Sequence, residues 1–296
     1  MATVESAVPI RARTRSERLV RLVSRGPLHI ALIGIAVLWL VPTVGLALTS
    51  FRKPPAIASS GWWHSFTQWD WTLHNYDSVI TATGMGHAWV NSVIITIPAT
   101  ILPLTLGALA AFGFAWVPFP FRDTLFLIIV ALMIVPIQTS LVPLLKLFAN
   151  HGHLNNHYYG IWLAHTAFGL PLAVFLLRNF FVTLPKDLIE AARIDGASNL
   201  AIFRRVVVPL SVPALASFAI FQFLWVWNDL LMALIFVSDP SKQPMTVRIP
   251  YLLSTYGQEY NLLAAAAFLL MILPLLVFFS LQRYFVQGLL AGSVKT

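Results

Sequence analysis

Cysteine is absent from this 296-residue chain, and charged residues make up only 10% of it. Without cysteine there can be no disulfide, no catalytic thiolate and no zinc–thiolate site. The shortage of charge argues against a water-soluble domain of this length, in which about 25% of residues are charged. We therefore expect most of the chain to lie in a bilayer.

Several short motifs of enzyme active sites are also missing. The sequence contains no GxxxxGK[ST] phosphate loop, no HExxH zinc motif and no GxSxG nucleophile elbow. It shows no paired acid and base groups. We interpret the chain as a protein without enzymatic activity of its own, so any ATP hydrolysis that drives it must occur on another chain.

Three of the eight histidines lie close together before the fourth apolar run, namely His151, His153 and His157. Their alternate spacing could ligate a metal, but no carboxylate or thiolate accompanies them. We interpret them as solvated loop residues. The sequence therefore predicts no metal site and no cofactor bound by this chain.

Apolar residues make up 58% of the chain and gather in six long runs. A helix needs about 20 consecutive apolar residues to cross the hydrocarbon core. The runs are Leu28–Ser50, Trp89–Trp116, Leu125–Phe148, Tyr158–Phe181, Pro209–Val237 and Leu262–Phe285. A closed β-barrel would instead show short alternating strands. The sequence predicts an all-α membrane protein with six transmembrane helices.

Polar segments flank and interrupt this helical region. We expect residues 1–27 to form a basic cytoplasmic arm, residues 28–286 the six-helix membrane domain, and residues 287–296 a cytoplasmic tail. Within the membrane domain, residues 182–208 form a cytoplasmic loop. The first apolar run has full spanning length and no cleavage site after a short run, so we expect it to remain in the mature protein.

Basic residues mark the cytoplasmic side of a membrane protein. Fourteen of the 19 lie at one side: Arg11, Arg13, Arg15, Arg18, Arg21, Arg25, Arg122, Arg178, Lys186, Arg193, Arg204, Arg205, Arg283 and Lys295. The other five are Arg52, Lys53, Lys146, Lys242 and Arg248. Both termini are therefore predicted to be cytoplasmic. The net charge of +8 indicates contact with anionic lipid headgroups, and we expect no nucleic-acid partner.

The cytoplasmic loop between the fourth and fifth runs is predicted to contain a short helix with defined ends. Thr183 can cap its start and Pro185 suits its first turn. Gly196 can end it in a left-handed conformation, and Ser198 can cap a second helix. The first helix could lie on lipid headgroups or dock in a groove of another protein.

The order of residues in this loop favours docking. Its motif resembles the signature loop of importer permeases of the ATP-binding-cassette (ABC) class, through Glu190, Ala191, Ala192, Asp195, Gly196, Ala197, Phe203, Pro209 and Pro213. The resemblance implies that this helix docks in a cleft of a cytoplasmic ATPase and transmits its closure to the membrane. It also implies the type I ABC importer permease fold.

Further segments resemble the maltose-type, carbohydrate-importing branch of that family. They are Trp89–Ser92, Trp225–Asp229, Gln282–Gly288 and Ala291–Lys295, and Ser59–Trp63 is similar to α-glucoside permeases. The resemblance implies the shorter, six-span permease of a heterodimeric pair, in a bacterial or archaeal cell membrane. Its implied partners are a second homologous permease, an extracytoplasmic sugar-binding protein reached by the loop Ser238–Asn261, and two ATPase subunits that hold ATP and Mg²⁺.

Polar residues inside the apolar runs are candidates for the solute path, because such groups are costly in hydrocarbon. The candidates are Gln138, Gln222, Trp225, Asn228 and Asp229. On a continuous helix Gln222, Trp225, Val226 and Asp229 would share one face. Amide, carboxylate and aromatic groups suit a sugar. The two glutamines could equally join helices without touching solute.

Four tryptophans in the first outer loop, Trp62, Trp63, Trp69 and Trp71, suit either sugar faces or the headgroup layer, and we favour membrane anchoring. The function predicted is import of an oligosaccharide or α-glucoside such as maltose or trehalose, by alternating access. One alternative is an ABC importer of another small solute, although a path for a charged solute would require more buried charge. The other is a secondary transporter or channel that works without an ATPase.

Overall fold

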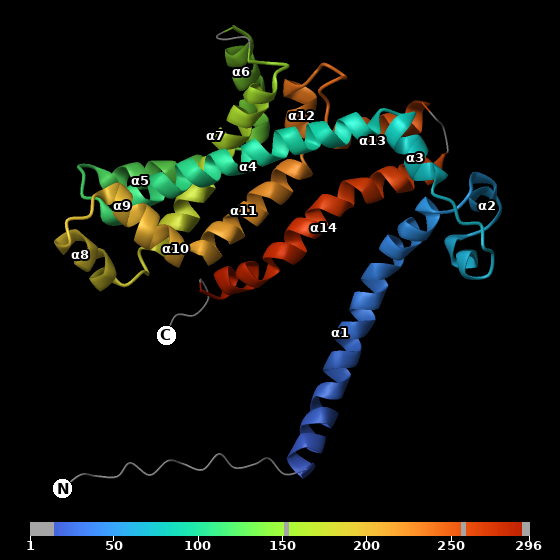
Figure 1. The fold of residues 1–296 in the computed structure, drawn as a ribbon, viewed down its shortest axis with the longest axis horizontal. Coiled ribbons are helices and arrows are strands. Elements are labelled where there is room, and N and C mark those ends of the chain that lie inside the picture. Colours follow the sequence, from blue (N-terminus) through green and yellow to red (C-terminus); the bar gives the residue numbers. More distant parts are fainter. Residues whose placement is uncertain (1–14, 151–153, 256–258, 292–296) are drawn as a thin grey trace.

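A computed structural model describes residues 15–150, 154–255 and 259–291 (Figure 1). His151, His153, residues 1–14 of the predicted arm and residues 292–296 of the predicted tail lie outside the described residues. The described elements are helical, apart from one isolated bridge between Arg52 and Trp71. The predicted all-α class is confirmed.

The elements before the cytoplasmic loop are α1 (Arg15–Ser50), α2 (Pro54–Ser59), η1 (Trp62–Phe66), α3 (His74–Thr81), α4 (Met85–Trp116), α5 (Arg122–Leu132), α6 (Ile137–Asn150) and α7 (Tyr158–Phe181). Those that follow are α8 (Lys186–Ile194), α9 (Asn199–Ile202), η2 (Phe203–Val207), α10 (Val208–Leu210), α11 (Val212–Trp227), α12 (Leu231–Phe236), α13 (Met245–Thr255) and α14 (Tyr260–Ala291). Here η1 is a 3₁₀ helix and η2 a π-helix.

Four helices among the described residues are long and apolar enough to cross a membrane unbroken: Gly26–Ser50, Met85–Trp116, Tyr158–Phe181 and Tyr260–Tyr284. They correspond to the first, second, fourth and sixth predicted spans. Two bent helix pairs bring the total to six if each pair is one span. The bends are the main departures from the sequence expectation.

The third span is not the continuous helix Leu125–Phe148 that we expected. It consists of α5 and α6, which meet at 100° around residues 133–136. Pro136 lies in this break; proline cannot donate a backbone hydrogen bond, and it disfavours helical geometry in the residue before it. The amide of Val135 bonds back to Leu132 O, which closes α5 with a tight turn.

The fifth span also differs from the predicted run Pro209–Val237. The helix bends by 79° at Ser211, between α10 and α11. Pro213 explains the bend, because its ring would clash with the carbonyl of Pro209 four residues earlier in a straight helix. The span then ends at Trp227, and α12 follows as a separate short helix after residues 228–230.

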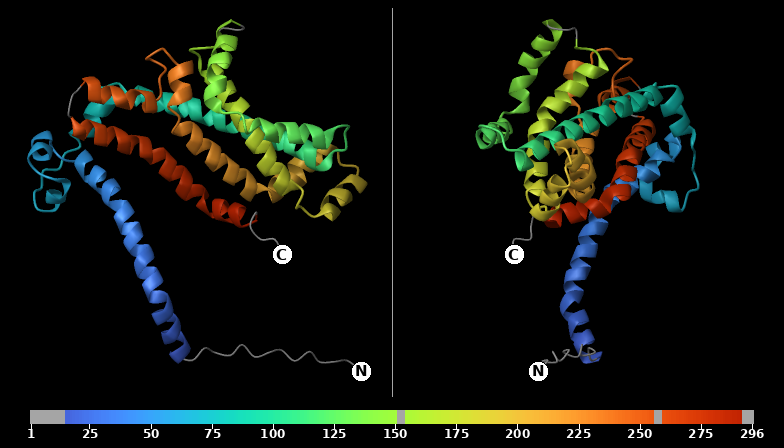
Figure 2. Two further views of the ribbon diagram at one scale, coloured as in Figure 1. Left: turned by 180° about the vertical axis from the view of Figure 1, so that it is seen from behind. Right: turned by 60° about the vertical axis from the view of Figure 1, so that its left-hand side comes forward.

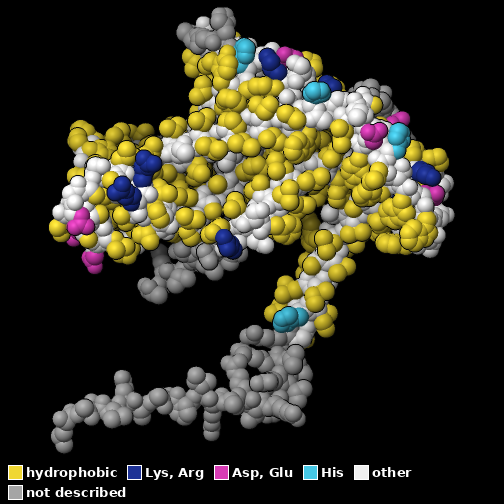
Figure 3. Space-filling model, in the orientation of Figure 1, with side chains coloured by type: hydrophobic (Ala, Val, Ile, Leu, Met, Phe, Trp, Pro, Cys, Tyr) yellow, Lys and Arg dark blue, Asp and Glu magenta, His cyan; other side chains and the backbone are white. Residues whose placement is uncertain are grey.

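The spans other than α1 form one bundle in which α4 and α7 pack along much of their length (Figures 1 and 2). Helix α1 instead projects away from the bundle and contacts mainly α14 near its outer end. Figure 3 shows an apolar surface over most of the molecule, with acidic and basic side chains at the end formed by α8 to α10 and again at the opposite end. Basic side chains at the first of these ends include Arg204 and Arg205. That end is the predicted cytoplasmic one.

Candidate functional site

Helix α8 has the C-terminal turn that the sequence predicted. Gly196 has a φ of +78°, in the left-handed region that favours glycine. The amide of Gly196 bonds to Arg193 O at 3.0 Å and that of Ala197 to Ala192 O at 3.0 Å. These two bonds form a Schellman motif, which satisfies carbonyls that a helix end leaves without partners.

The predicted caps have mixed outcomes. The Ser198 hydroxyl accepts a bond from the Ala201 amide at 3.3 Å, so its capping of α9 is confirmed. The predicted cap by Thr183 is wrong, because its hydroxyl donates to Phe180 O at 2.7 Å in the last turn of α7. Pro185 lies immediately before the first residue of α8, at the N-cap.

The two faces of α8 have opposite surroundings. Ile189 is only 1% exposed and packs in a cluster that includes Leu177 and Phe181 at the end of α7. On the other side Leu188 and Ile194 are exposed, Ile194 by 86%, and they flank the exposed motif residues Glu190, Ala191, Asp195 and Gly196. The motif residues Ala192 and Ala197 are half-buried against the cluster. The helix is therefore anchored on one face and open to a partner on the other.

Two polar contacts link α8 to the end of α4 and that end of α4 to the end of α7. Arg193 Nη2 donates to Trp116 O, the last carbonyl of α4, at 2.6 Å. The Trp116 indole in turn donates to Phe181 O, at the end of α7, at 3.1 Å. Carbonyls at the end of a helix lack partners within that helix, so the bond from Arg193 satisfies Trp116 O. Phe181 O also accepts from the Leu184 amide at 3.3 Å. A connected set of contacts therefore runs from α8 to the end of α4 and on to the end of α7.

Gln222 lies fully buried between three helices. Its side-chain nitrogen donates to Ala99 O of α4 at 3.1 Å, and its exposed fraction is 0%. A Cβ placed on Gly169 of α7 would come within 2.7 Å of the Gln222 oxygen, so a larger residue there would displace the Gln222 amide. Within this chain, the geometry is that of an interhelical contact.

The remaining path candidates lie in different surroundings. Gln138 is exposed, one residue after the start of α6. Asn228 is exposed and its side chain donates to Leu224 O at 2.8 Å. Trp225 is half-buried and makes an edge contact with His165, with ring centres 5.4 Å apart.

Asp229 does not extend the face of Gln222 and Trp225 as we expected, because α11 ends at Trp227. Its carboxylate accepts from the amides of Met232 at 3.4 Å and Ala233 at 3.1 Å, which caps the start of α12. Its backbone carbonyl accepts from the Thr246 hydroxyl of α13 at 2.8 Å. Asp229 thus joins the end of α11 to both outer helices.

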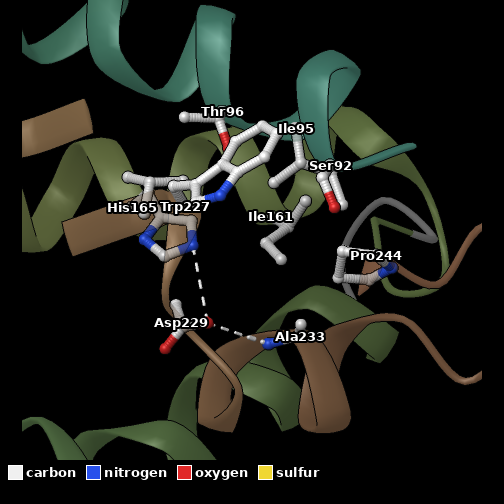
Figure 4. A pocket seen from close by; sticks show the side chains of 10 residues that line it. Ser92, Ile95, Thr96, Ile161, His165, Trp227, Asp229, Ala233 and Pro244 are labelled. Carbon is white, nitrogen blue, oxygen red and sulfur yellow. Dashed lines mark hydrogen bonds and ion pairs between the residues drawn. The ribbon is translucent and has the colours of Figure 1, made fainter. Parts of the chain in front are cut away.

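A small polar cavity of about 10 Å³ lies beside Asp229, between α4, α7 and α11 (Figure 4). It is lined by Ser92, Ile95, Thr96, Ile161, His165, Val226, Trp227, Asp229, Ala233 and Pro244. His165 and Asp229 point toward one another across it, with 3.7 Å between His165 Nε2 and Asp229 Oδ2. His165 was not among the residues predicted from the sequence. The signal was one histidine within the apolar run Tyr158–Phe181.

The Trp89–Ser92 segment fastens the last outer loop to the bundle. The Asn91 amide donates to Ser241 O at 2.8 Å and to Gln243 O at 3.1 Å. Ser92 accepts from the Met245 amide at 2.9 Å. In the same loop, hydrogen bonds from the Ser241 hydroxyl and amide hold the pKa of Asp239 below its ordinary value. The loop is therefore held in place by α4.

The tryptophan-rich outer loop lies next to the outer end of α1. Trp62 lies over Gly45 of α1, whereas Trp63 and Trp69 are exposed. Of the three clustered histidines, only His157 lies within the described residues. Its ring stacks on that of Tyr159, with the ring centres 4.9 Å apart. Among the described residues, no group of three or more His, Asp or Glu could hold a metal ion.

Residues 103–290 match the family described as binding-protein-dependent transport system inner membrane component. The chain belongs to this family. The chain is 50% identical over 275 residues to the osmoprotective compounds uptake permease protein GgtD of Synechocystis sp.. The match covers 91% of this chain and 92% of GgtD. The chain is 51% identical over 229 residues to the alpha-glucoside transport system permease protein AglG of Rhizobium meliloti, covering 76% of this chain but only 60% of AglG.

Solved structures show the same fold for this inner membrane component. A chain in the crystal structure of a bacterial ABC transporter involved in alginate import matches with a TM-score of 0.73. The match covers 93% of this chain and 99% of that one, at 22% sequence identity. The predicted type I ABC importer permease fold is therefore confirmed.

Proposed function

We propose that this chain is the membrane permease subunit of an ATP-driven, binding-protein-dependent importer of α-glucosides or related neutral oligosaccharides. The observation that carries the proposal is the way in which α8 is attached to the bundle. It is a short helix that is anchored by Ile189, tied to two spans through Arg193 and Trp116, and open on its outer face. A helix attached in this way can transmit the movement of a separate ATPase subunit to the membrane helices.

In the proposed mechanism, two cytoplasmic ATPase subunits hold ATP and Mg²⁺, and this chain hydrolyses nothing itself. Closure of the motor moves α8, and the bonds from Arg193 and Trp116 carry the movement to the ends of α4 and α7. The outward-facing residues Glu190, Ala191 and Ile194 form the contact with the motor, and the exposed apolar side chains suit a protein groove.

The solute path requires a second permease subunit. Gln138 and Asn228 are exposed in this chain alone, so they are available to face a partner or the solute. An extracytoplasmic sugar-binding protein delivers the solute at the opposite end, where Asn91 holds the loop that begins at Ser238. Both termini lie in the cytoplasm, as the distribution of basic residues predicts.

The solute class is supported by the relatives and by the scarcity of buried charge. AglG is named for α-glucosides, and MelC of Bacillus subtilis, 34% identical over 96% of this chain, is named for melibiose, raffinose and stachyose. A charged solute would demand more buried charge than Asp229 supplies. A neutral oligosaccharide fits both observations.

The decisive experiment is solute-stimulated ATP hydrolysis by the assembled transporter in proteoliposomes. We expect stimulation by one or more α-linked disaccharides or trisaccharides in the presence of the binding protein, and none by phosphate or amino acids. Stimulation by a charged solute alone would refute the sugar assignment. Solute uptake by the purified chain without any ATPase would refute the importer class and establish a secondary transporter or channel.

A further inference from the structure

His165 is a buried polar side chain for which this structure provides no hydrogen bond. Its exposed fraction is 0%, and neither ring nitrogen has a hydrogen-bond partner within the described residues. The ring is held in place by apolar contact, including the edge of Trp225. A buried polar group without a partner costs roughly 1–3 kcal/mol, so its presence here calls for a reason.

The groups around His165 offer one ionisable partner. Of the hydroxyls that line the cavity, that of Ser92 already donates to Ala88 O and accepts from the Met245 amide. Asp229 Oδ2 lies 3.7 Å from His165 Nε2, outside hydrogen-bond distance but aimed at it (Figure 4). Movement of Asp229 toward α7 would bring the two atoms into a hydrogen bond.

Asp229 is placed where such a shift can occur. The same oxygen that faces His165 accepts from the Ala233 amide, so the carboxylate moves with the start of α12 (Figure 4). Residues 228–230 between α11 and α12 are not helical, and the adjoining cavity leaves room for side-chain movement. The Asp229 carbonyl also holds α13 through Thr246.

We propose that His165 and Asp229 form a latch between α7 and the outer helices α12 and α13. The latch is open in this structure and closes when the junction of α11 and α12 moves toward α7 during the transport cycle. On closing, His165 donates a hydrogen bond to Asp229 and gains the partner that it lacks here. Both are positioning residues: they fix the position of α12 and α13 relative to α7 and do not contact ATP. The role in the cycle rests on the proposed function.

Because this chain contains no cysteine, spin labels can be attached to it at introduced cysteines alone. Leu163→Cys on α7 and Leu234→Cys on α12 place spin labels at exposed positions on the two sides of the latch. Pulsed EPR then gives the distance distribution in the assembled transporter in nanodiscs, with and without a non-hydrolysable ATP analogue. We expect the analogue to populate a second distance in the otherwise unmutated chain.

Two substitutions separate hydrogen bonding from packing. His165→Leu removes both ring nitrogens, so the second distance should disappear while the first is kept. His165→Gln retains a donor, and the second distance should return at least in part. Because the ring makes no hydrogen bond in the open state, His165→Leu should leave the thermal unfolding temperature unchanged or raised.

The latch is refuted if the otherwise unmutated chain shows a single distance in both conditions. It is also refuted if His165→Leu responds to the analogue as that chain does, or if His165→Gln behaves like His165→Leu. A lowered unfolding temperature for His165→Leu with unchanged distances would indicate a purely structural role. Failure of the proposed function would appear separately, as absence of solute-stimulated ATPase activity in the unlabelled transporter.

Discussion

Asn91 uses its side chain to join segments that are far apart in the sequence. It donates to two loop carbonyls, of which Ser241 O is 150 residues away, and it accepts from the Tyr158 hydroxyl at 2.8 Å. Because the side chain is only 6% exposed, water cannot easily replace these bonds. At the scale of single residues, this one buried amide therefore makes three of the hydrogen bonds that position the outer loop, beside the bond from Met245 to Ser92.

Replacing Asn91 should destabilise the protein. Asn91→Ala leaves two carbonyls and a hydroxyl without their partner, which we expect to cost about 2 kcal/mol. Thermal unfolding of the purified protein in detergent should show a lower transition temperature. The matched control is Thr105→Ala on the same helix, whose exposed hydroxyl bonds only within α4. Equal transition temperatures for the two variants would contradict the assignment.

Helix α8 illustrates how one short element combines local and tertiary signals. Its C-terminal turn is specified by Gly196, whereas its position depends on Ile189 and Arg193, which contact residues from α4 and α7. The bends in the third and fifth spans likewise start from a proline. The resulting angles are 100° and 79°.

Substitution of Gly196 should uncouple ATP hydrolysis from uptake. Gly196→Val adds no clash, since no atom lies within 4 Å of its Cβ position, but it opposes the left-handed φ by more than about 1–2 kcal/mol. The α8 end should rearrange while the bundle still folds. Uptake per ATP hydrolysed in proteoliposomes should fall several-fold. Gly196→Asn tolerates this φ and should remain near the unmutated ratio. Normal coupling in Gly196→Val would exclude the proposed role of the turn.

At the scale of the whole molecule, the end that carries α8 and the end that carries the outer loops lie on opposite sides of the helix bundle (Figure 1). Both ends carry acidic and basic side chains (Figure 3). The end opposite α8 also carries the outer loops, in which Trp63 and Trp69 are exposed. Helix α1 leaves the bundle, and only 6% of its most apolar window is buried, so lipid or another subunit must cover it. This surface of α1 is therefore available to lipid or to a second subunit.

The orientation of the two ends can be tested on single cysteines in this cysteine-free chain. Thr67→Cys lies in the first outer loop and Lys186→Cys at the start of α8, and both positions are exposed. A membrane-impermeant maleimide should label Thr67→Cys in intact spheroplasts. Lys186→Cys should react only after lysis. Labelling of Lys186→Cys in intact cells would invert the proposed topology.

Features that depend on a few neighbouring residues were determined by the sequence alone. Apolar runs specify spanning helices because hydrocarbon leaves backbone groups no partner outside the helix. The left-handed turn at Gly196 and the cap at Ser198 were predictable because the bonds close within six residues. The motif of α8 was sufficient to indicate its family.

Only the tertiary structure decided which polar groups meet. Asp229 lies on a helical face in the sequence pattern, but in the fold it caps α12 after α11 has ended. His165 and Asp229 are 64 positions apart in the sequence, so no helical or strand periodicity pairs them. Their approach results from the packing of α7 against α11 and α12. Such packing depends on the shapes of many side chains at once, which periodicity along one segment does not encode.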